Sequence, residues 1–92
     1  MEEKAKEVAS LLKILSNHHR LLILCALEDG EKTVGELNLF ISKIGMSALS
    51  QHLSSMKNFG LIDCDKRGQN VYYFITDNKI LNVIHVLKDN YC

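Results

Sequence analysis

Residues 46–62, MSALSQHLSSMKNFGLI, constrain the fold more than any other segment of the chain. Leu49, Leu53 and Met56 recur at i, i+4 and i+7, a spacing that predicts a helix with one apolar stripe. The remaining face carries short hydroxyl and amide side chains, namely Ser47, Ser50, Gln51, Ser54 and Ser55. Such side chains let a helix come close to a DNA groove and can bond base edges or phosphates. We therefore interpret residues 46–59 as a candidate DNA-reading helix, with a plain polar surface as the alternative.

Three more helices are predicted upstream, over residues 2–15, 18–28 and 34–41. The first has an apolar stripe at helical spacing, and the second is apolar nearly all round, which predicts a central place in the core. Ser16 or Asn17 can cap the second helix, and Thr33 with Glu36 forms a capping box before the third. Residues 42–45 are predicted to form a turn. A helix, a short turn and a helix with a polar outer face indicate a helix-turn-helix over about residues 33–59.

After Gly60 the apolar period changes from 3.6 to 2. Residues 61–64 and 71–76 are predicted strands, joined by a tight turn over residues 65–70. A hairpin placed directly after a reading helix is a wing, here spanning about residues 61–76. Its tip carries Lys66, Arg67, Gln69 and Asn70 around Gly68, which suits phosphate or minor-groove contact. A plain solvated hairpin turn is the alternative. Asp77 and Asn78 then cap a last helix that runs to residue 91.

These elements predict one domain over residues 1–92, mainly α with a small β-hairpin, in the order α-α-α-α-β-β-α. The fold class is a winged helix-turn-helix. The terminal helices, over about residues 2–15 and 78–91, carry more apolar surface than a core of this size needs. Pairing them across a two-fold axis would bury that surface, so we expect a homodimer.

The charge balance excludes some classes of protein. The chain has 11 Lys and Arg against 11 Asp and Glu, so its formal net charge is zero. This argues against a general nucleic-acid coat protein, which needs clustered cations. No apolar run is long enough to cross a membrane, no export leader is evident, and the three cysteines lack paired spacing, so a cytoplasmic location is expected. An enzyme is not expected, because no cysteine has a general base beside it.

Four segments resemble the winged helix-turn-helix regulators of the ArsR/SmtB family, small dimeric bacterial repressors that respond to metals or to sulfur and redox stress. They read LKILSNHHRLLILCAL (12–27), TVGEL (33–37), SALSQHLSSMKNFGLI (47–62) and RGQNVYYFIT (67–76), and span most of the chain in the family's order. The resemblance implies a homodimer built from the first and last helices. Its two reading helices would bind an imperfect palindrome in double-stranded DNA, one DNA turn apart.

The resemblance also implies which residues contact DNA. Ser47, Ala48, Ser50, Gln51 and Ser54 would face bases or phosphates, with Lys57 at the end of the same helix and Lys66, Arg67, Gln69 and Asn70 in the wing. His52 lies nearer the apolar side, and we interpret it as structural or hydrogen-bonded. The segment ISKIGM departs from the family pattern, because it is about one residue longer than usual before the reading helix.

The family's metal sites do not match this sequence. Thiolate-type sensors carry a Cys-x-Cys pair in the third helix, where this chain reads ELNLF. Zinc sensors begin the last helix with Asp-x-His, whereas Asp77 is followed here by Asn78 and Lys79, and His85 is the one histidine on that helix. We therefore expect no metal and no cofactor, and keep a metal-responsive repressor as an alternative.

Two cysteines suggest another signal. Cys25 in the second helix and Cys92 at the end of the last one resemble the cysteine pair of the sulfur- and redox-responsive BigR, SqrR and HlyU branch. In that branch the two thiols join on exposure to persulfides or oxidants, and DNA binding weakens. Cys25 as a small core hydrophobe is the alternative. Cys64 lies between Asp63 and Asp65, whose charges disfavour a thiolate, so we interpret it as a bystander. A winged helix that binds only proteins is a further alternative, favoured by the neutral charge.

Overall fold

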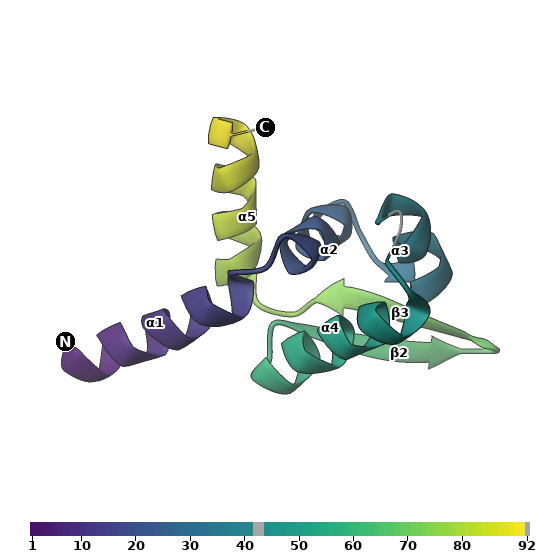
Figure 1. Cartoon of the computed structure of the whole chain (residues 1–92), viewed down its shortest axis with the longest axis horizontal. Helices are drawn as coiled ribbons and strands as arrows, with labels where there is room; N and C mark the ends of the chain where they lie inside the picture. The colour runs from purple at the N-terminus through teal and green to yellow at the C-terminus, as the bar shows by residue number, and fades with distance from the viewer. Residues whose placement is uncertain (42–43, 92) are drawn as a thin grey trace.

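The computed structural model describes residues 1–41 and 44–91, which form five helices and three short strands. The elements are α1 (Glu2–Leu15), α2 (His18–Glu28), β1 (Lys32–Thr33), α3 (Val34–Phe40), α4 (Met46–Phe59), β2 (Ile62–Arg67), β3 (Asn70–Ile75) and α5 (Asn78–Tyr91). This arrangement, drawn in Figure 1, confirms the predicted winged helix-turn-helix class. Of the turn predicted over residues 42–45, Ser42 and Lys43 lie outside the described residues.

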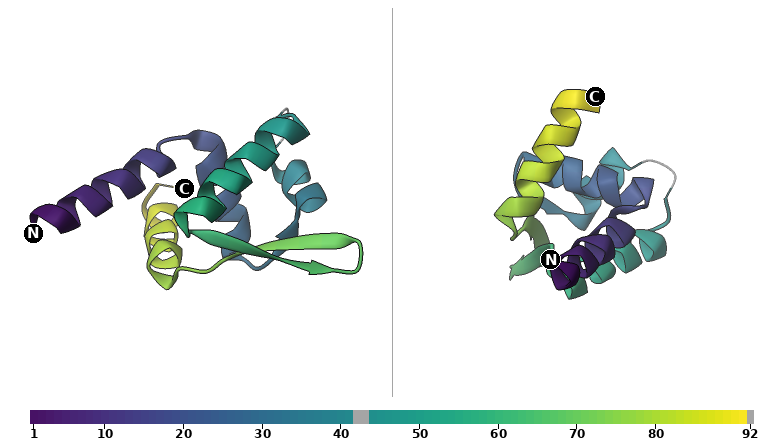
Figure 2. Two further views of the ribbon diagram at one scale, coloured as in Figure 1. Left: turned by 90° about the horizontal axis from the view of Figure 1, so that it is seen from below. Right: turned by 90° about the vertical axis from the view of Figure 1, so that its left-hand side faces the viewer.

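The molecule is elongated, measuring 44 × 27 × 22 Å along its principal axes. Helices α2, α3 and α4 form the body with the small sheet, α1 reaches away to one side, and the β2–β3 hairpin extends to the other (Figures 1 and 2). α4 and the wing therefore belong to one continuous part of the molecule, while α1 stands largely outside it.

The core lies where the apolar faces of α2, α4 and α5 meet. In α4 the predicted stripe is confirmed, because Leu49, Leu53 and Met56 are all fully buried. Among residues 1–41 and 44–91, the buried residues are Leu15, Ile23, Leu24, Ala26, Leu27, Leu37, Ile41, Leu49, Leu53, Met56, Leu61, Ile62, Ile80 and Ile84. Burial of one side of α4 fixes the rotation of the helix about its axis, and this determines which side chains face outward.

Local signals set the helix ends. The Asn17 side chain accepts hydrogen bonds from the backbone N–H groups of His19 and Arg20, so Asn17 is the cap of α2. The predicted capping box is confirmed, because Thr33 and Glu36 bond each other's backbone N–H groups at 2.9 and 3.1 Å. α4 ends at Gly60, whose φ of 98° is left-handed and favours glycine.

The sheet is antiparallel in the order β1-β3-β2. Its hairpin is longer than predicted: β2 continues to Arg67, which pairs with Asn70, so the turn shortens to Gly68 and Gln69. Charged side chains do not prevent this pairing, because the ladder uses backbone groups and the side chains point into solvent. Strand β1 was not predicted. It is only two residues long, and it forms because β3 offers a free edge to Lys32 and Thr33.

The terminal helices leave apolar side chains in solvent. On α1, Val8 and Leu12 are 52% and 59% exposed. On α5 the exposed apolar side chains are Val83, Val86, Leu87 and Tyr91. This is the surplus apolar surface from which the homodimer was predicted. No described helix is both long enough and apolar enough to cross a membrane.

Candidate nucleic-acid interface

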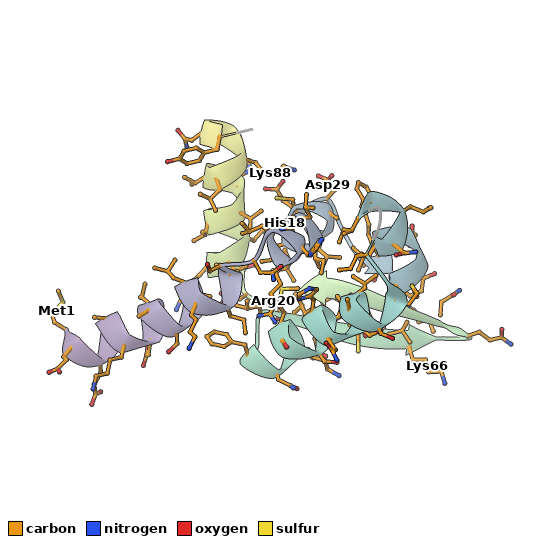
Figure 3. The ribbon with its side chains drawn as sticks, in the orientation of Figure 1. Met1, His18, Arg20, Asp29, Lys66 and Lys88 are labelled. Atoms are coloured by element: carbon orange, nitrogen blue, oxygen red, sulfur yellow. The ribbon has the colours of Figure 1, made fainter. Side chains whose placement is uncertain are left out.

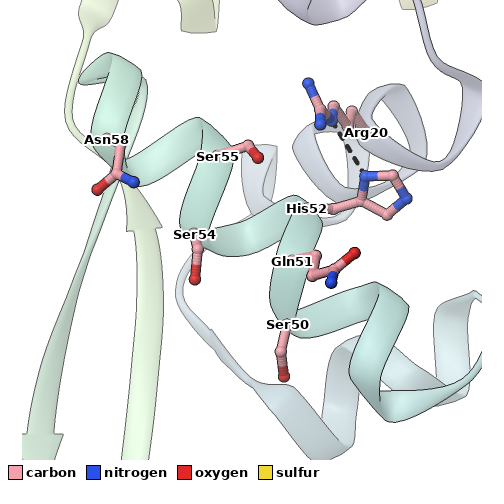
Figure 4. A pocket seen from close by; sticks show the side chains of 7 residues that line it. All are labelled: Arg20, Ser50, Gln51, His52, Ser54, Ser55 and Asn58. Carbon is pink, nitrogen blue, oxygen red and sulfur yellow. Dashed lines mark hydrogen bonds between the residues drawn. The ribbon is translucent and has the colours of Figure 1, made fainter.

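The outward face of α4 contains a hollow of about 390 Å³, which we call the α4 hollow. It is lined by Arg20, Ser50, Gln51, His52, Ser54, Ser55 and Asn58 (Figure 4). The structure thus brings together three of the predicted contact residues, Ser50, Gln51 and Ser54. Ser47 and Ala48 lie in the first turn of α4 and do not line the hollow. Lys57 is exposed near the other end, with its Nζ 4.0 Å from a carboxylate oxygen of Asp63.

Arg20 was not among the predicted interface residues. It belongs to α2, yet Figure 4 shows its side chain reaching across to His52 on α4. The two residues are 32 positions apart in the chain. No spacing rule links residues so far apart, and the only signal in the sequence was a cation at the start of an otherwise apolar helix.

Arg20 and His52 are joined by a hydrogen bond in which the arginine is the donor. Arg20 Nε donates to His52 Nδ1 at 3.0 Å, and Arg20 Nη1 donates to the Ile14 carbonyl at 3.2 Å. Since Nδ1 accepts a hydrogen bond, His52 is neutral and carries its proton on Nε2. Burial, followed by the charges of Arg20, His19 and His18, lowers the pKa of His52. This hydrogen bond agrees with the interpretation of His52 as structural or hydrogen-bonded.

This lowered pKa predicts a pH dependence of stability. In the unfolded chain His52 takes up a proton near its ordinary pKa of 6.5, whereas the folded protein takes it up only at lower pH. The neutral His52 ring therefore contributes to the free energy of unfolding above about pH 6.5, and this contribution is lost as the pH falls below that value. We expect the melting temperature to drop between about pH 7.5 and pH 5.5, and to drop less in His52→Gln, whose amide oxygen still accepts from Arg20. Thermal melts at both pH values test this, and equal drops in the two proteins would contradict it.

The four predicted wing residues are all exposed to solvent, but Arg67 differs from the others because it forms an ion pair. Lys66, Gln69 and Asn70 are exposed, and Lys66 lies toward the tip (Figure 3). The guanidinium of Arg67 pairs with Glu31, lies 3.6 Å from Asp65, and stacks 4.0 Å above the Tyr72 ring. The hydrogen bond with Glu31 raises the pKa of Arg67. Arg67 would have to leave Glu31 to bind a phosphate, so its role in DNA contact stays a prediction.

Cys25 lies away from this face, in a groove of about 440 Å³ between α2 and α5. The groove is lined by His18, Leu21, Leu22, Cys25, Ile84, Leu87, Lys88 and Tyr91. At its edge Lys88 Nζ donates to Glu28 Oε1 at 2.7 Å, a bond that lowers the pKa of Glu28 and raises the pKa of Lys88. Cys25 is half-buried, and its predicted partner Cys92 lies outside the described residues.

The third cysteine and the possible metal ligands were also located in the described part of the chain. Cys64 is half-buried in β2, and its backbone N–H donates to Asp63 Oδ1. Within residues 1–41 and 44–91, no three side chains of His, Cys, Asp or Glu are grouped to hold a metal ion.

The fold and the polar hollow on the second helix of the helix-turn-helix agree with the comparison of this chain with known families. The sequence profile described as "Bacterial regulatory protein, arsR family" matches residues 17–63, about half of the chain. The chain belongs to the ArsR family. It is therefore a DNA-binding transcriptional regulator, and the predicted family is confirmed.

Individual ArsR-family relatives agree with this assignment. The transcriptional activator HlyU of Vibrio cholerae is 38% identical over the whole of this chain and 84% of its own length. Its reduced structure matches with a TM-score of 0.93, covering 100% of this chain and 96% of that one. The structure of the repressor BigR from Xylella fastidiosa, 37% identical, has a TM-score of 0.90 and covers 100% and 93% of the two chains. These relatives are regulators, not enzymes. A Mycobacterium bovis structure, 25% identical with a TM-score of 0.81 and covering 96% and 81%, is described as a homodimeric winged helix-turn-helix DNA-binding domain.

Proposed function

We propose that this ArsR-family regulator acts as a homodimer that places α4 of each protomer in successive major grooves of an imperfectly palindromic operator. The observation that carries this proposal is the outward face of α4. It is hollowed and lined by hydroxyl and amide side chains, and the sequence of α4 contains no acidic residue. A helix face free of negative charge can approach phosphates without repulsion, and Gln51 has the donor and acceptor needed to recognise a base pair.

The proposed contacts divide into two kinds. Gln51, Ser50 and Ser54 line the α4 hollow and are assigned to base edges or nearby phosphates. Ser47 and Ala48, in the first turn of α4, are likewise assigned to bases or phosphates. The flanking backbone or the minor groove is assigned to Lys57 near the end of α4 and to Lys66, Arg67, Gln69 and Asn70 of the wing. Because the net charge is zero, affinity has to come from the local placement of cations on this face.

The proposed dimer uses α1 and α5. Their exposed apolar side chains, among them Val8, Leu12 and Val86, would be buried against the partner. A homodimeric relative with the same fold supports this assembly. Two-fold symmetry then sets the separation of the reading helices at about one DNA turn.

We assign control of binding to a Cys25–Cys92 dithiol. Cys25 and Tyr91 line the same groove, and Cys92 follows Tyr91 in the sequence. Oxidation would join the two sulfur atoms, releasing two protons and two electrons to a polysulfide or peroxide. Because α2 packs against α4 as well as α5, a bridge between α2 and the end of α5 would favour one arrangement of the scaffold over another.

Fluorescence anisotropy of a labelled duplex from the promoter of the protein's own gene tests both parts of the proposal. Tight binding by reduced protein that weakens with salt, is lost after polysulfide treatment and returns with dithiothreitol would support operator binding and the switch. Binding that ignores polysulfide would remove the switch and leave the regulator. Failure to bind this duplex, or any duplex recovered by random-site selection, would overturn the operator-binding role.

The cysteine assignment makes its own prediction. Cys25→Ser is expected to bind the promoter duplex as well as the wild type in reductant, and to keep binding after polysulfide treatment. Cys64→Ser serves as the matched control, because Cys64 is half-buried in the wing. This substitution should leave the loss of DNA binding after polysulfide treatment intact. Weak binding by reduced Cys25→Ser would favour a packing role for Cys25. Loss of the response in Cys64→Ser would contradict the choice of thiols.

A further inference from the structure

We propose that Arg20, from outside the helix-turn-helix, binds a DNA backbone phosphate at the edge of the α4 hollow. This inference rests on the proposed operator binding by α4. It extends the interface to α2, a helix for which the sequence predicted no DNA contact.

The first argument is position. Arg20 lines the α4 hollow together with Gln51 and Ser54, so a DNA strand seated against α4 passes within reach of its guanidinium (Figure 4). The hydroxyl and amide groups around it can supply further donors to a phosphate oxygen. Among the described residues, the others that line the hollow belong to α4, so Arg20 is the contribution of a second helix.

The second argument is charge. Two other cations of the proposed interface lie close to carboxylates: Lys57 lies near Asp63, and Arg67 pairs with Glu31. Within the described part of the chain, Arg20 forms no such ion pair, and the two acceptors of its side chain are the neutral His52 ring and the Ile14 carbonyl. The positive charge of Arg20 is therefore not cancelled locally. A phosphate could bind it without displacing a carboxylate.

The third argument is orientation. The bonds to His52 and Ile14 use Nε and Nη1, and no acceptor among the described residues is bonded to Nη2. An arginine held at two nitrogens has already lost much of its rotational freedom, so less entropy is lost when a phosphate binds the third. His52 thus keeps the guanidinium at the edge of the hollow while leaving a donor available.

The salt dependence of DNA binding tests this assignment. The probes are a labelled 30-base-pair promoter duplex and a scrambled duplex of the same length, titrated between about 50 and 300 mM salt. For Arg20→Gln we expect affinity about 10- to 100-fold weaker for both duplexes near 0.1 M salt. Each lost phosphate contact removes about 0.9 from the slope of log K against log salt, so the slope of the dimer should fall by about 2.

Two variants separate this role from a structural one. Arg20→Lys keeps the charge and should keep most of the salt slope. Lys6→Gln removes one positive charge from the exposed part of α1, outside the α4 hollow, and should leave the slope unchanged. A wild-type slope in folded Arg20→Gln, with or without loss of affinity, would overturn the inference while leaving operator binding in place. Wild-type protein that binds neither duplex would overturn both proposals.

Discussion

Replacing Gln51 by alanine is expected to weaken operator binding by about 30-fold or more without changing the fold. Gln51 is exposed and lines the α4 hollow. A glutamine that bonds an adenine edge with both its donor and its acceptor contributes about 1–3 kcal/mol to discrimination, and a homodimer uses it twice. The loss should be concentrated on one base position in each half-site, because a base contact specifies sequence whereas a phosphate contact does not.

Competition anisotropy with single-base variants of the operator measures this effect. Binding of Gln51→Ala to a scrambled duplex should change little, and its free energy of unfolding should stay within about 0.5 kcal/mol of the wild type, as for an ordinary surface position. Ser10→Ala, at an exposed site on α1, is the control for loss of a small polar surface group. If Gln51→Ala bound the operator and all its base variants as the wild type does, Gln51 would have no reading role.

Replacing Leu53 by alanine, on the same helix, should lower the stability of the protein and leave its base preference unchanged. Leu53 is fully buried in the core, two positions from Gln51. Its truncation removes apolar contacts and leaves a cavity, so the free energy of unfolding should fall by about 2–5 kcal/mol. Chemical denaturation at a fixed protein concentration measures this, because the stability of a dimer depends on concentration.

Leu53→Met is the matched control. It conserves volume and apolarity, and should reduce the free energy of unfolding by less than about 1.5 kcal/mol. A loss below about 1 kcal/mol in Leu53→Ala would mean that the buried stripe does not anchor α4. DNA binding by Leu53→Ala, measured where it is still folded, should retain the base preference of the wild type, because Gln51 and its neighbours are untouched.

The helices were predictable because each is defined by local signals. Apolar spacing marked the buried face of α4, and Asn17, Thr33 and Gly60 marked helix ends through bonds or dihedral angles confined to a few residues. The exposed position of Gln51 followed from the same periodicity, since a buried stripe on one side fixes what lies on the other.

The missed features depend on contacts between distant segments. Strand β1 exists only because Lys32 and Thr33 meet the edge of β3, some 40 positions later. The hairpin exceeded its predicted length because backbone pairing extended through Arg67, beyond the apolar residues used to find it. Arg20 reached the α4 hollow through the packing of α2 on α4, which periodicity within either helix does not reveal.

The protruding α1 has a consequence for gene control. Residues 2–10 of this helix are all exposed in the single chain, and a helix of 14 residues is marginal in water without packing partners. If the partner protomer supplies that packing, ordering of α1 and association become one event. The amount of competent regulator would then rise with the square of the chain concentration while dimers are scarce. A modest change in synthesis or turnover of the protein would shift promoter occupancy more than proportionally. Promoter occupancy would therefore show a threshold in protein concentration even without an inducer.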